Sequence, residues 1–151
     1  MSSVRKYLRL GVLAASLAMY AYSLSLPALL FQHRDALPGG HILAWGWWGI
    51  LMLQFAWIAN PAYAFAVLCY AKRKQAYAAI ACVVALFLGL TSFQAQEWWF
   101  NEGSGTPILG LGLGFRIWLL SFLILLVGCA IPVEPNPPLN TDAGDETARA
   151  G

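Results

Sequence analysis

The sequence predicts an all-α integral membrane bundle of four transmembrane helices, and three features lead to this fold class. Hydrophobic residues make up 60% of the chain and charged residues only 11%, whereas soluble domains average about 25% charged residues. The apolar residues fall into four long runs, and the charges lie mainly beside and between these runs. The length of 151 residues suits a single domain, which we expect to cover 1–131.

The first predicted span covers 10–31, because the chain carries no formal charge between Arg9 and Arg34. This run is longer than the apolar core of a secretory signal peptide, which holds roughly 7–15 residues before a small-residue cleavage site. We therefore expect an uncleaved membrane span. Pro27 predicts a kink or an early end of the helix, since proline cannot donate a backbone hydrogen bond.

The second predicted span, 42–70, lies in the longest stretch of the chain without a charged side chain. One straight helix of this length would measure about 43 Å, against about 30 Å for the hydrocarbon core of a bilayer. The span must therefore tilt, kink or begin among the lipid headgroups. Trp45, Trp47 and Trp48 favour a start among the headgroups, and Pro61 after Asn60 predicts a kink in the inner half.

The third and fourth predicted spans cover 76–93 and 115–131. In the third span Ala81, Ala85 and Gly89 recur at four-residue spacing, which predicts a smooth face that a neighbouring helix can approach closely. Before the fourth span, glycine occupies every second position from Gly110 to Gly114. Because each glycine weakens a helix interior by about 1 kcal/mol, we expect an irregular or interfacial segment there.

The composition changes after residue 131, where four prolines and several acidic residues replace the apolar run. Such a segment buries too little apolar surface to offset the entropy lost on folding. We therefore expect 132–151 to form a disordered, acidic tail.

Basic residues predict the orientation, because Lys and Arg close to membrane spans stay on the cytoplasmic side. Four spans bring six basic residues close to the membrane on the side of the N-terminus, against Arg34 and Arg116 on the other side. The six are Arg5, Lys6, Arg9, Lys72, Arg73 and Lys74. We therefore expect both termini in the cytoplasm and the protein in the cytoplasmic (inner) membrane of a bacterium.

Polar residues within the second span form the first candidate binding site. Asn60 can bond a neighbouring helix, for about 1 kcal/mol, or satisfy the carbonyl groups that Pro61 leaves free. A broken span can also build a transport site in the middle of the membrane, here with Gln54 and Asn60. The structural interpretation and the transport interpretation both stay open at this stage.

Three residues near the predicted outer interface form the second candidate site. Arg116 is the single full charge in the last apolar stretch, and an ionisable residue within a membrane is a functional hypothesis by default. It can instead extend into the headgroups, or pair with Glu97 or Glu102. Trp98 and Trp99 are typical of interfacial anchors, and an aromatic binding patch on the outer face is the alternative.

No group of residues predicts catalysis, because no Ser/His/Asp or Cys/His set converges on one face. We predict neither an enzyme nor a cofactor. His33, Asp35 and His41 lack the compact spacing of metal ligands, so no metal site is expected. The three cysteines contain no CxxC pair and are expected to pack as small apolar residues. A net charge of +2 is too small to predict a nucleic-acid surface.

A pattern of aromatic, polar and glycine motifs extends over about residues 40–125. It comprises Trp47-Trp48-Gly49, Gln54-Phe55-Ala56-Trp57 with Asn60-Pro61, and Gly110-Leu111-Gly112-Leu113-Gly114-Phe115 leading into Trp118. This pattern resembles a group of small bacterial multi-pass inner-membrane proteins of unknown function. The resemblance implies a membrane protein and carries no activity with it.

The predicted function is a non-enzymatic subunit that binds a partner, as an accessory or immunity-type protein. Small-residue helix faces and a tryptophan-rich outer surface favour this interpretation. The alternative is a small oligomeric transporter or channel that uses the helix break at Asn60 and Pro61. The expected partners are the lipid bilayer and either a membrane protein or a second copy of the chain.

Overall fold

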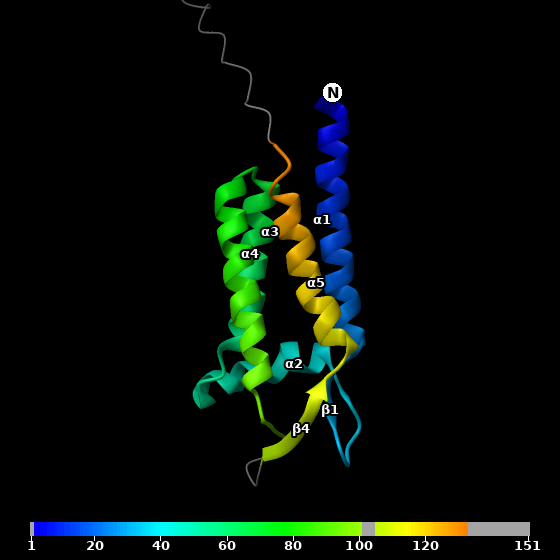
Figure 1. Cartoon of the computed structure of the whole chain (residues 1–151), viewed down its shortest axis with the longest axis vertical. Helices are drawn as coiled ribbons and strands as arrows, with labels where there is room; N and C mark the ends of the chain where they lie inside the picture. The colour runs from blue at the N-terminus through cyan, green and yellow to red at the C-terminus, as the bar shows by residue number, and fades with distance from the viewer. Residues whose placement is uncertain (1, 101–104, 133–151) are drawn as a thin grey trace, which may run out of the picture.

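The computed structural model describes residues 2–100 and 105–132. Its four long helices lie side by side and alternate in direction (Figure 1). They are α1 (Ser2–Ser25), α3 (Ala59–Ala71), α4 (Gln75–Leu90) and α5 (Leu113–Gly128). Helix α1 packs mainly against α5 and α3 against α4, and contacts between α4 and α5 join the two pairs.

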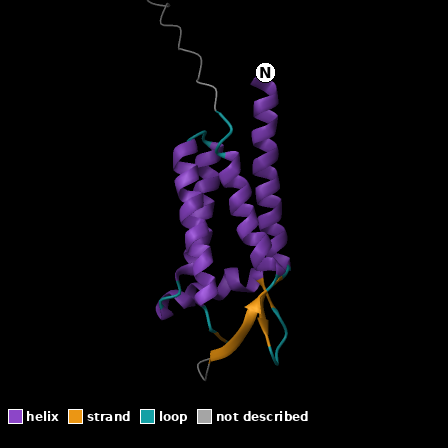
Figure 2. Cartoon of the chain, in the orientation of Figure 1, coloured by secondary structure: helices purple, strands orange, loops and turns teal. Residues whose placement is uncertain are grey.

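The two ends of this bundle differ. The start of α1, the turn between α3 and α4 and the end of α5 lie together at one end (Figure 1), which we call the basic end because Arg5, Arg9 and Lys72 to Lys74 lie there. The other end is covered by strands and short helices, and we call it the capped end (Figure 2).

The cap contains a four-stranded antiparallel sheet with the order β2-β1-β4-β3. The strands are β1 (Pro27–Phe31), β2 (Leu37–Pro38), β3 (Glu97–Trp99) and β4 (Gly105–Leu111). The short helices are α2 (Gly39–Trp45) and the 3-10 segments η1 (Gly46–Met52), η2 (Phe55–Ile58) and η3 (Thr91–Gln94). The fold is thus mostly helical, as predicted, but it also holds a small sheet that an all-α fold does not include.

The first predicted span is shorter than expected at its outer end. Helix α1 ends at Ser25, so the early end predicted from Pro27 is confirmed, but 27–31 forms β1 instead of helix. In this strand Leu29 pairs with Leu111 of β4. Leu29 and Phe31 alternate toward a small core that also holds Leu37, which is the side-chain period of a strand.

The second predicted span is not one helix, because a break at Leu53 and Gln54 separates η1 from η2 and α3. Leu53 has a left-handed backbone with φ of 59°, and Gln54 is extended. The predicted kink at Asn60 and Pro61 is wrong. Pro61 lies in the first turn of α3, where a backbone N–H has no helical partner and its loss disturbs nothing.

A contact between η2 and α2 explains why the chain folds back at this break. The Trp57 indole nitrogen donates a hydrogen bond of 2.9 Å to the Leu43 carbonyl. A Cβ on Gly46 would lie 2.9 Å from Trp57 Cδ1, so only glycine lets the indole approach α2 this closely. This contact between Trp57 and α2 therefore outweighs the tendency of 42–70 to continue as one helix.

The third and fourth predicted spans match α4 and α5 to within a few residues. Ala81, Ala85 and Gly89 are buried, so the smooth face of α4 is confirmed. A Cβ on Gly89 would lie 2.7 Å from Leu119 Cδ2 of α5. The small residues of α4 therefore serve contacts inside the bundle.

The alternating glycines are partly strand and partly helix start instead of an irregular segment. Gly110 lies in β4, and α5 begins at Leu113. A Cβ on Gly112 would collide with the carbonyl of Pro27, and one on Gly114 would lie 2.7 Å from the Leu26 carbonyl oxygen. These two glycines let the start of α5 pass close to the backbone that leaves α1.

The centre of the bundle combines stacked rings with buried hydroxyl groups. The Tyr63 ring stacks on Tyr20 and Phe122, with centroids 5.0 and 4.6 Å away. The hydroxyl oxygens of Ser16 and Tyr63 lie 2.6 Å apart, and Ser16 donates a 2.7 Å bond to the Ser121 carbonyl. Two linked hydrogen bonds through Ser16 thus join α1, α3 and α5 across the core, where the low polarity strengthens them.

At the basic end Arg9 joins α1 to the end of α3. Its guanidinium donates a 2.9 Å bond to the Tyr70 carbonyl and lies 5.0 Å from the centroid of the Tyr70 ring. A cation is favoured there because the last carbonyl groups of a helix carry partial negative charge. Cys69 and Cys82 are free thiols buried in the core nearby, as expected for small apolar residues.

Two helical stretches in the described part of the chain, Ser3–Ser25 and Gln75–Gln94, are long and apolar enough to cross a membrane. Two further apolar helices, Phe55–Ala71 and Leu113–Gly128, are shorter. Four membrane spans therefore stay a prediction. Of the predicted tail, 133–151 lies outside the described residues.

Candidate functional site

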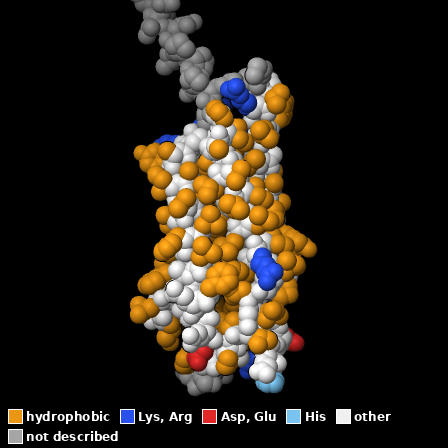
Figure 3. All heavy atoms as spheres, viewed as in Figure 1, with side chains coloured by type: hydrophobic (Ala, Val, Ile, Leu, Met, Phe, Trp, Pro, Cys, Tyr) orange, Lys and Arg blue, Asp and Glu red, His pale blue; other side chains and the backbone are white. Residues whose placement is uncertain are grey.

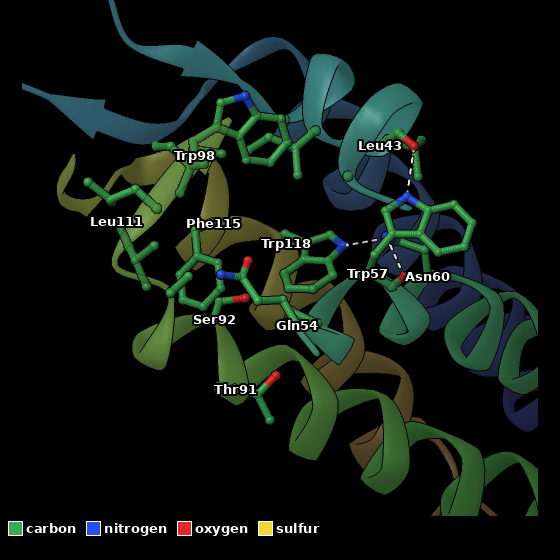
Figure 4. A pocket seen from close by; sticks show the side chains of 18 of the residues that line it. Leu43, Gln54, Trp57, Asn60, Thr91, Ser92, Trp98, Leu111, Phe115 and Trp118 are labelled. Carbon is green, nitrogen blue, oxygen red and sulfur yellow. Dashed lines mark hydrogen bonds between the residues drawn. The ribbon is translucent and has the colours of Figure 1, made fainter. Parts of the chain in front are cut away.

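A cavity of about 400 Å³ lies between the capped end of the bundle and the segments that cross it. Its walls come from the end of α1, α2, the joint between η1 and η2, η3, β4 and the first turns of α3 and α5 (Figure 4). Small-molecule pockets have volumes of about 300–1,000 Å³. The cavity is therefore large enough for an organic ligand.

Asn60 holds three elements together beside this cavity. Its Oδ1 accepts hydrogen bonds of 3.0 Å from the Tyr20 hydroxyl of α1 and from the Trp118 indole of α5. Its Nδ2 donates a 3.0 Å bond to the Trp57 carbonyl. The predicted bond from Asn60 to neighbouring helices is thus confirmed, and its amide is largely occupied by the protein itself.

Aromatic rings form much of the apolar wall. Phe115 and Trp118 lie on adjacent turns of α5 with their centroids 5.8 Å apart, and Trp118 meets Phe122 at 4.8 Å. Trp98 of β3 lines the cavity from the side of the sheet (Figure 4). The indole N–H of Trp118 already bonds Asn60, so this ring offers mainly apolar surface.

Gln54 and Ser92 supply polar groups that stay open toward the cavity. The Gln54 side chain, from the break between η1 and η2, points toward Ser92 and Phe115 (Figure 4). Thr91 donates a 2.6 Å bond to the Leu88 carbonyl of its own helix, whereas Gln54 and Ser92 form no side-chain hydrogen bond within the described part of the chain. None of the described residues that line the cavity carries a formal charge.

Three of the five predicted site residues, Gln54, Asn60 and Trp98, line this one cavity. The sequence places them in two separate segments, and the fold brings them together. Trp99 is exposed on β3 and does not line the cavity. Trp99 therefore fits the predicted role of an interfacial anchor better than that of a ligand contact.

Arg116 also lies outside the cavity. It is exposed on the first turn of α5, beside a separate hollow that it shares with Phe93 and Leu109. Within the described residues Arg116 and Glu97 form no ion pair, and Glu102 lies outside them. The exposed position is compatible with the predicted extension of the guanidinium into headgroups, which stays a prediction.

Sequence reasoning missed the roles of Trp118 and Ser92. From the sequence, Trp118 stood out as the residue into which the glycine motif leads, whereas in the structure its indole points inward to Asn60. The spacing of Phe115, Trp118 and Phe122, at i, i+3 and i+7, is the signal of one inward helix face. Ser92 carries no such signal, because its position depends on the short segment η3.

No group of three or more metal-ligating side chains occurs among the described residues; His33, Asp35 and His41 are all exposed on the cap. Comparison with protein-family models, with curated proteins and with solved structures finds no match for this chain. The resemblance to small bacterial membrane proteins therefore stays a prediction.

Proposed function

We propose that the chain is a four-span protein of the bacterial cytoplasmic membrane that acts by binding a membrane-protein partner. In this proposal it is a non-enzymatic subunit of the accessory or immunity type, and both termini lie in the cytoplasm.

Apolar side chains on the outside of all four long helices support membrane insertion. Figure 3 shows hydrophobic side chains over most of the flank of the bundle in view, with Lys and Arg near the basic end and also in the lower part of the view. Large exposed examples from the four helices are Leu10, Leu17, Phe65, Leu68, Ile80, Phe87, Leu123 and Val127. Soluble monomers rarely expose apolar patches larger than a few hundred Å², whereas lipid favours such a surface.

Helices α3 and α5 are short for membrane spans, and they fit this proposal only if the cap also lies partly in the membrane. The 16 residues of α5 form a helix of about 24 Å, against about 30 Å of hydrocarbon. The cap covers the difference with its own apolar surface, since Trp48, Leu51 and Leu53 of η1 and its C-cap are all exposed. Tryptophan is typical of the interface between hydrocarbon and headgroups.

An open face of small residues on α1 carries the proposal of a helical partner. Gly11, Ala14, Ala18 and Ala21 recur at three- or four-residue spacing and are all exposed, and nothing lies within 4 Å of a Cβ built on Gly11. The equivalent face of α4 is closed by contacts within the bundle. Open small-residue faces in membranes let a second helix approach closely.

Co-purification in mild detergent from the native host tests this proposal. We expect a membrane protein to elute with the chain at fixed stoichiometry. Ala18→Leu should lower the recovered partner about tenfold, because the larger side chain keeps the two helices apart. Ala64→Leu, the same change at an exposed position of α3, should leave recovery unchanged. Equal recovery with both variants would contradict the interface on α1.

The second candidate, an oligomeric transporter, has one observation in its favour. The helix break lies at Leu53 and Gln54 instead of Asn60 and Pro61, and Gln54 faces the cavity. Transporters often bind substrates at broken helices. A homo-oligomer without a partner that moves solute into liposomes would favour this candidate over the first.

A further inference from the structure

The cavity at the capped end has features that select among ligands by charge and polarity. Its open polar groups include the amides of Gln54 and Gln94 and the hydroxyl of Ser92, and all three are uncharged. Its apolar surface includes the rings of Trp98, Phe115 and Trp118. A ligand that matches this lining combines an oxygen-bearing head with an apolar body.

A charged head would find no opposite charge in the described lining. Transfer of an ionised group from water into such surroundings is costly unless it is paired. The exposed guanidinium of Arg116 borders the neighbouring hollow and not the cavity. The lining therefore disfavours phosphate and ammonium heads relative to neutral alcohols, esters and ketones.

The outer surface of the same wall indicates where such a ligand comes from. Elements α2 and η1 line the cavity with Ile42 and Met52, and on their outer side they expose Trp45 and Trp48. Exposed tryptophans of membrane proteins are enriched at the level of the headgroups. In the proposed membrane orientation, the cavity therefore lies at the depth where the heads of membrane amphiphiles are found.

We propose that this cavity binds an uncharged membrane amphiphile, with its oxygen-bearing head between Gln54 and Ser92 and its apolar part against Trp98, Phe115 and Trp118. Diacylglycerols and quinones share this chemistry. The proposal depends on the membrane placement of the chain and is independent of the partner interface on α1.

Native mass spectrometry of the purified protein in detergent tests the proposal with four short-chain probes. They are a diacylglycerol, a quinone, a phosphatidylglycerol and a phosphatidylcholine. We expect a one-to-one adduct with at least one of the two uncharged probes. Comparing the diacylglycerol adduct with the quinone adduct shows which of these two classes of amphiphile the cavity prefers. Phosphatidylcholine is included because indole faces also attract quaternary ammonium groups.

Two pairs of variants locate the adduct. Gln54→Leu removes a hydrogen-bonding group and should weaken binding about tenfold, which corresponds to about 1.4 kcal/mol. Ala95→Phe places a ring in the cavity that Ala95 lines and should weaken binding at least as much. Gln96→Leu and Ala44→Phe make the same changes at exposed positions outside the cavity, and should bind as the unaltered chain does.

Two results would overturn the proposal. One is binding of either phospholipid, the anionic phosphatidylglycerol or the zwitterionic phosphatidylcholine, as tightly as the uncharged probes. The other is that Gln54→Leu and its control Gln96→Leu bind the uncharged probes equally, whether both keep the adduct or neither forms one. Gln54 is exposed, so Gln54→Leu leaves the fold intact even where Ala95→Phe does not. If no protein partner co-purifies but the cavity still binds an uncharged amphiphile, only the proposed interface on α1 is contradicted.

Discussion

Asn60 accepts hydrogen bonds from Tyr20 and Trp118 and donates one to the Trp57 carbonyl. Hydrogen bonds between helices in membranes contribute about 0.6 kcal/mol on average and up to about 1.7. The cost of losing a partner is larger, because a half-buried indole N–H is then left without an acceptor. Asn60 thus acts by positioning the cavity wall, while Gln54 and Ser92 remain open to a ligand.

Replacement of Asn60 by leucine should lower the free energy of unfolding by about 2 kcal/mol, since three bonds are lost together. Equilibrium unfolding by SDS in mixed micelles measures this difference. Thr91→Val removes only one bond, to the Leu88 carbonyl in the preceding turn, and should cost less than half as much. If both variants lose the same free energy of unfolding, the three hydrogen bonds of Asn60 together stabilise the protein no more than the single bond of Thr91.

At the scale of the elements, the break between η1 and η2 creates the cavity by turning the chain back over the end of the bundle. Leu53 adopts φ of 59° there, which an L-residue with a side chain adopts at a cost of roughly 1–2 kcal/mol. Its side chain is 78% exposed, so packing does not repay this strain. The strained backbone persists because Trp57 bonds Leu43 and fixes η2 against α2.

Leu53→Gly should therefore stabilise the chain by about 0.5 kcal/mol, because glycine relieves the left-handed strain but is more flexible when unfolded. Leu53→Val should destabilise it by about 1 kcal/mol, since β-branched residues tolerate positive φ poorly. The same SDS titration gives both values. A variant series in which valine is as stable as glycine would contradict a left-handed backbone at this position.

At the scale of the whole molecule, sequence periodicity and composition located α4 and α5 and the early end of α1 at Pro27. They did not reveal the sheet, because the apolar residues 27–31 suit the end of a helix as well as a buried strand. The strand becomes favourable only through β4, which is distant in the sequence. For the same reason Gln54 and Trp98 were predicted as separate candidates, and only the tertiary fold unites them in one cavity.

The up-and-down arrangement makes a prediction about membrane topology that single cysteines test. In a chain with Cys69, Cys82 and Cys129 replaced by alanine, Ala36→Cys lies exposed on the cap and Lys74→Cys lies exposed at the basic end. With both termini in the cytoplasm, a membrane-impermeant maleimide should label Ala36→Cys in intact spheroplasts. It should label Lys74→Cys only after the membrane is permeabilised.

Ala64→Cys, exposed on the side of α3, serves as the control for burial in lipid. A thiol in hydrocarbon stays protonated and unreactive, so this variant should resist labelling under both conditions and react after denaturation. Labelling of Lys74→Cys in intact spheroplasts would reverse the orientation without affecting the bundle. Rapid labelling of Ala64→Cys in the native protein would show that water, and not lipid, covers the apolar flank, and would contradict membrane insertion.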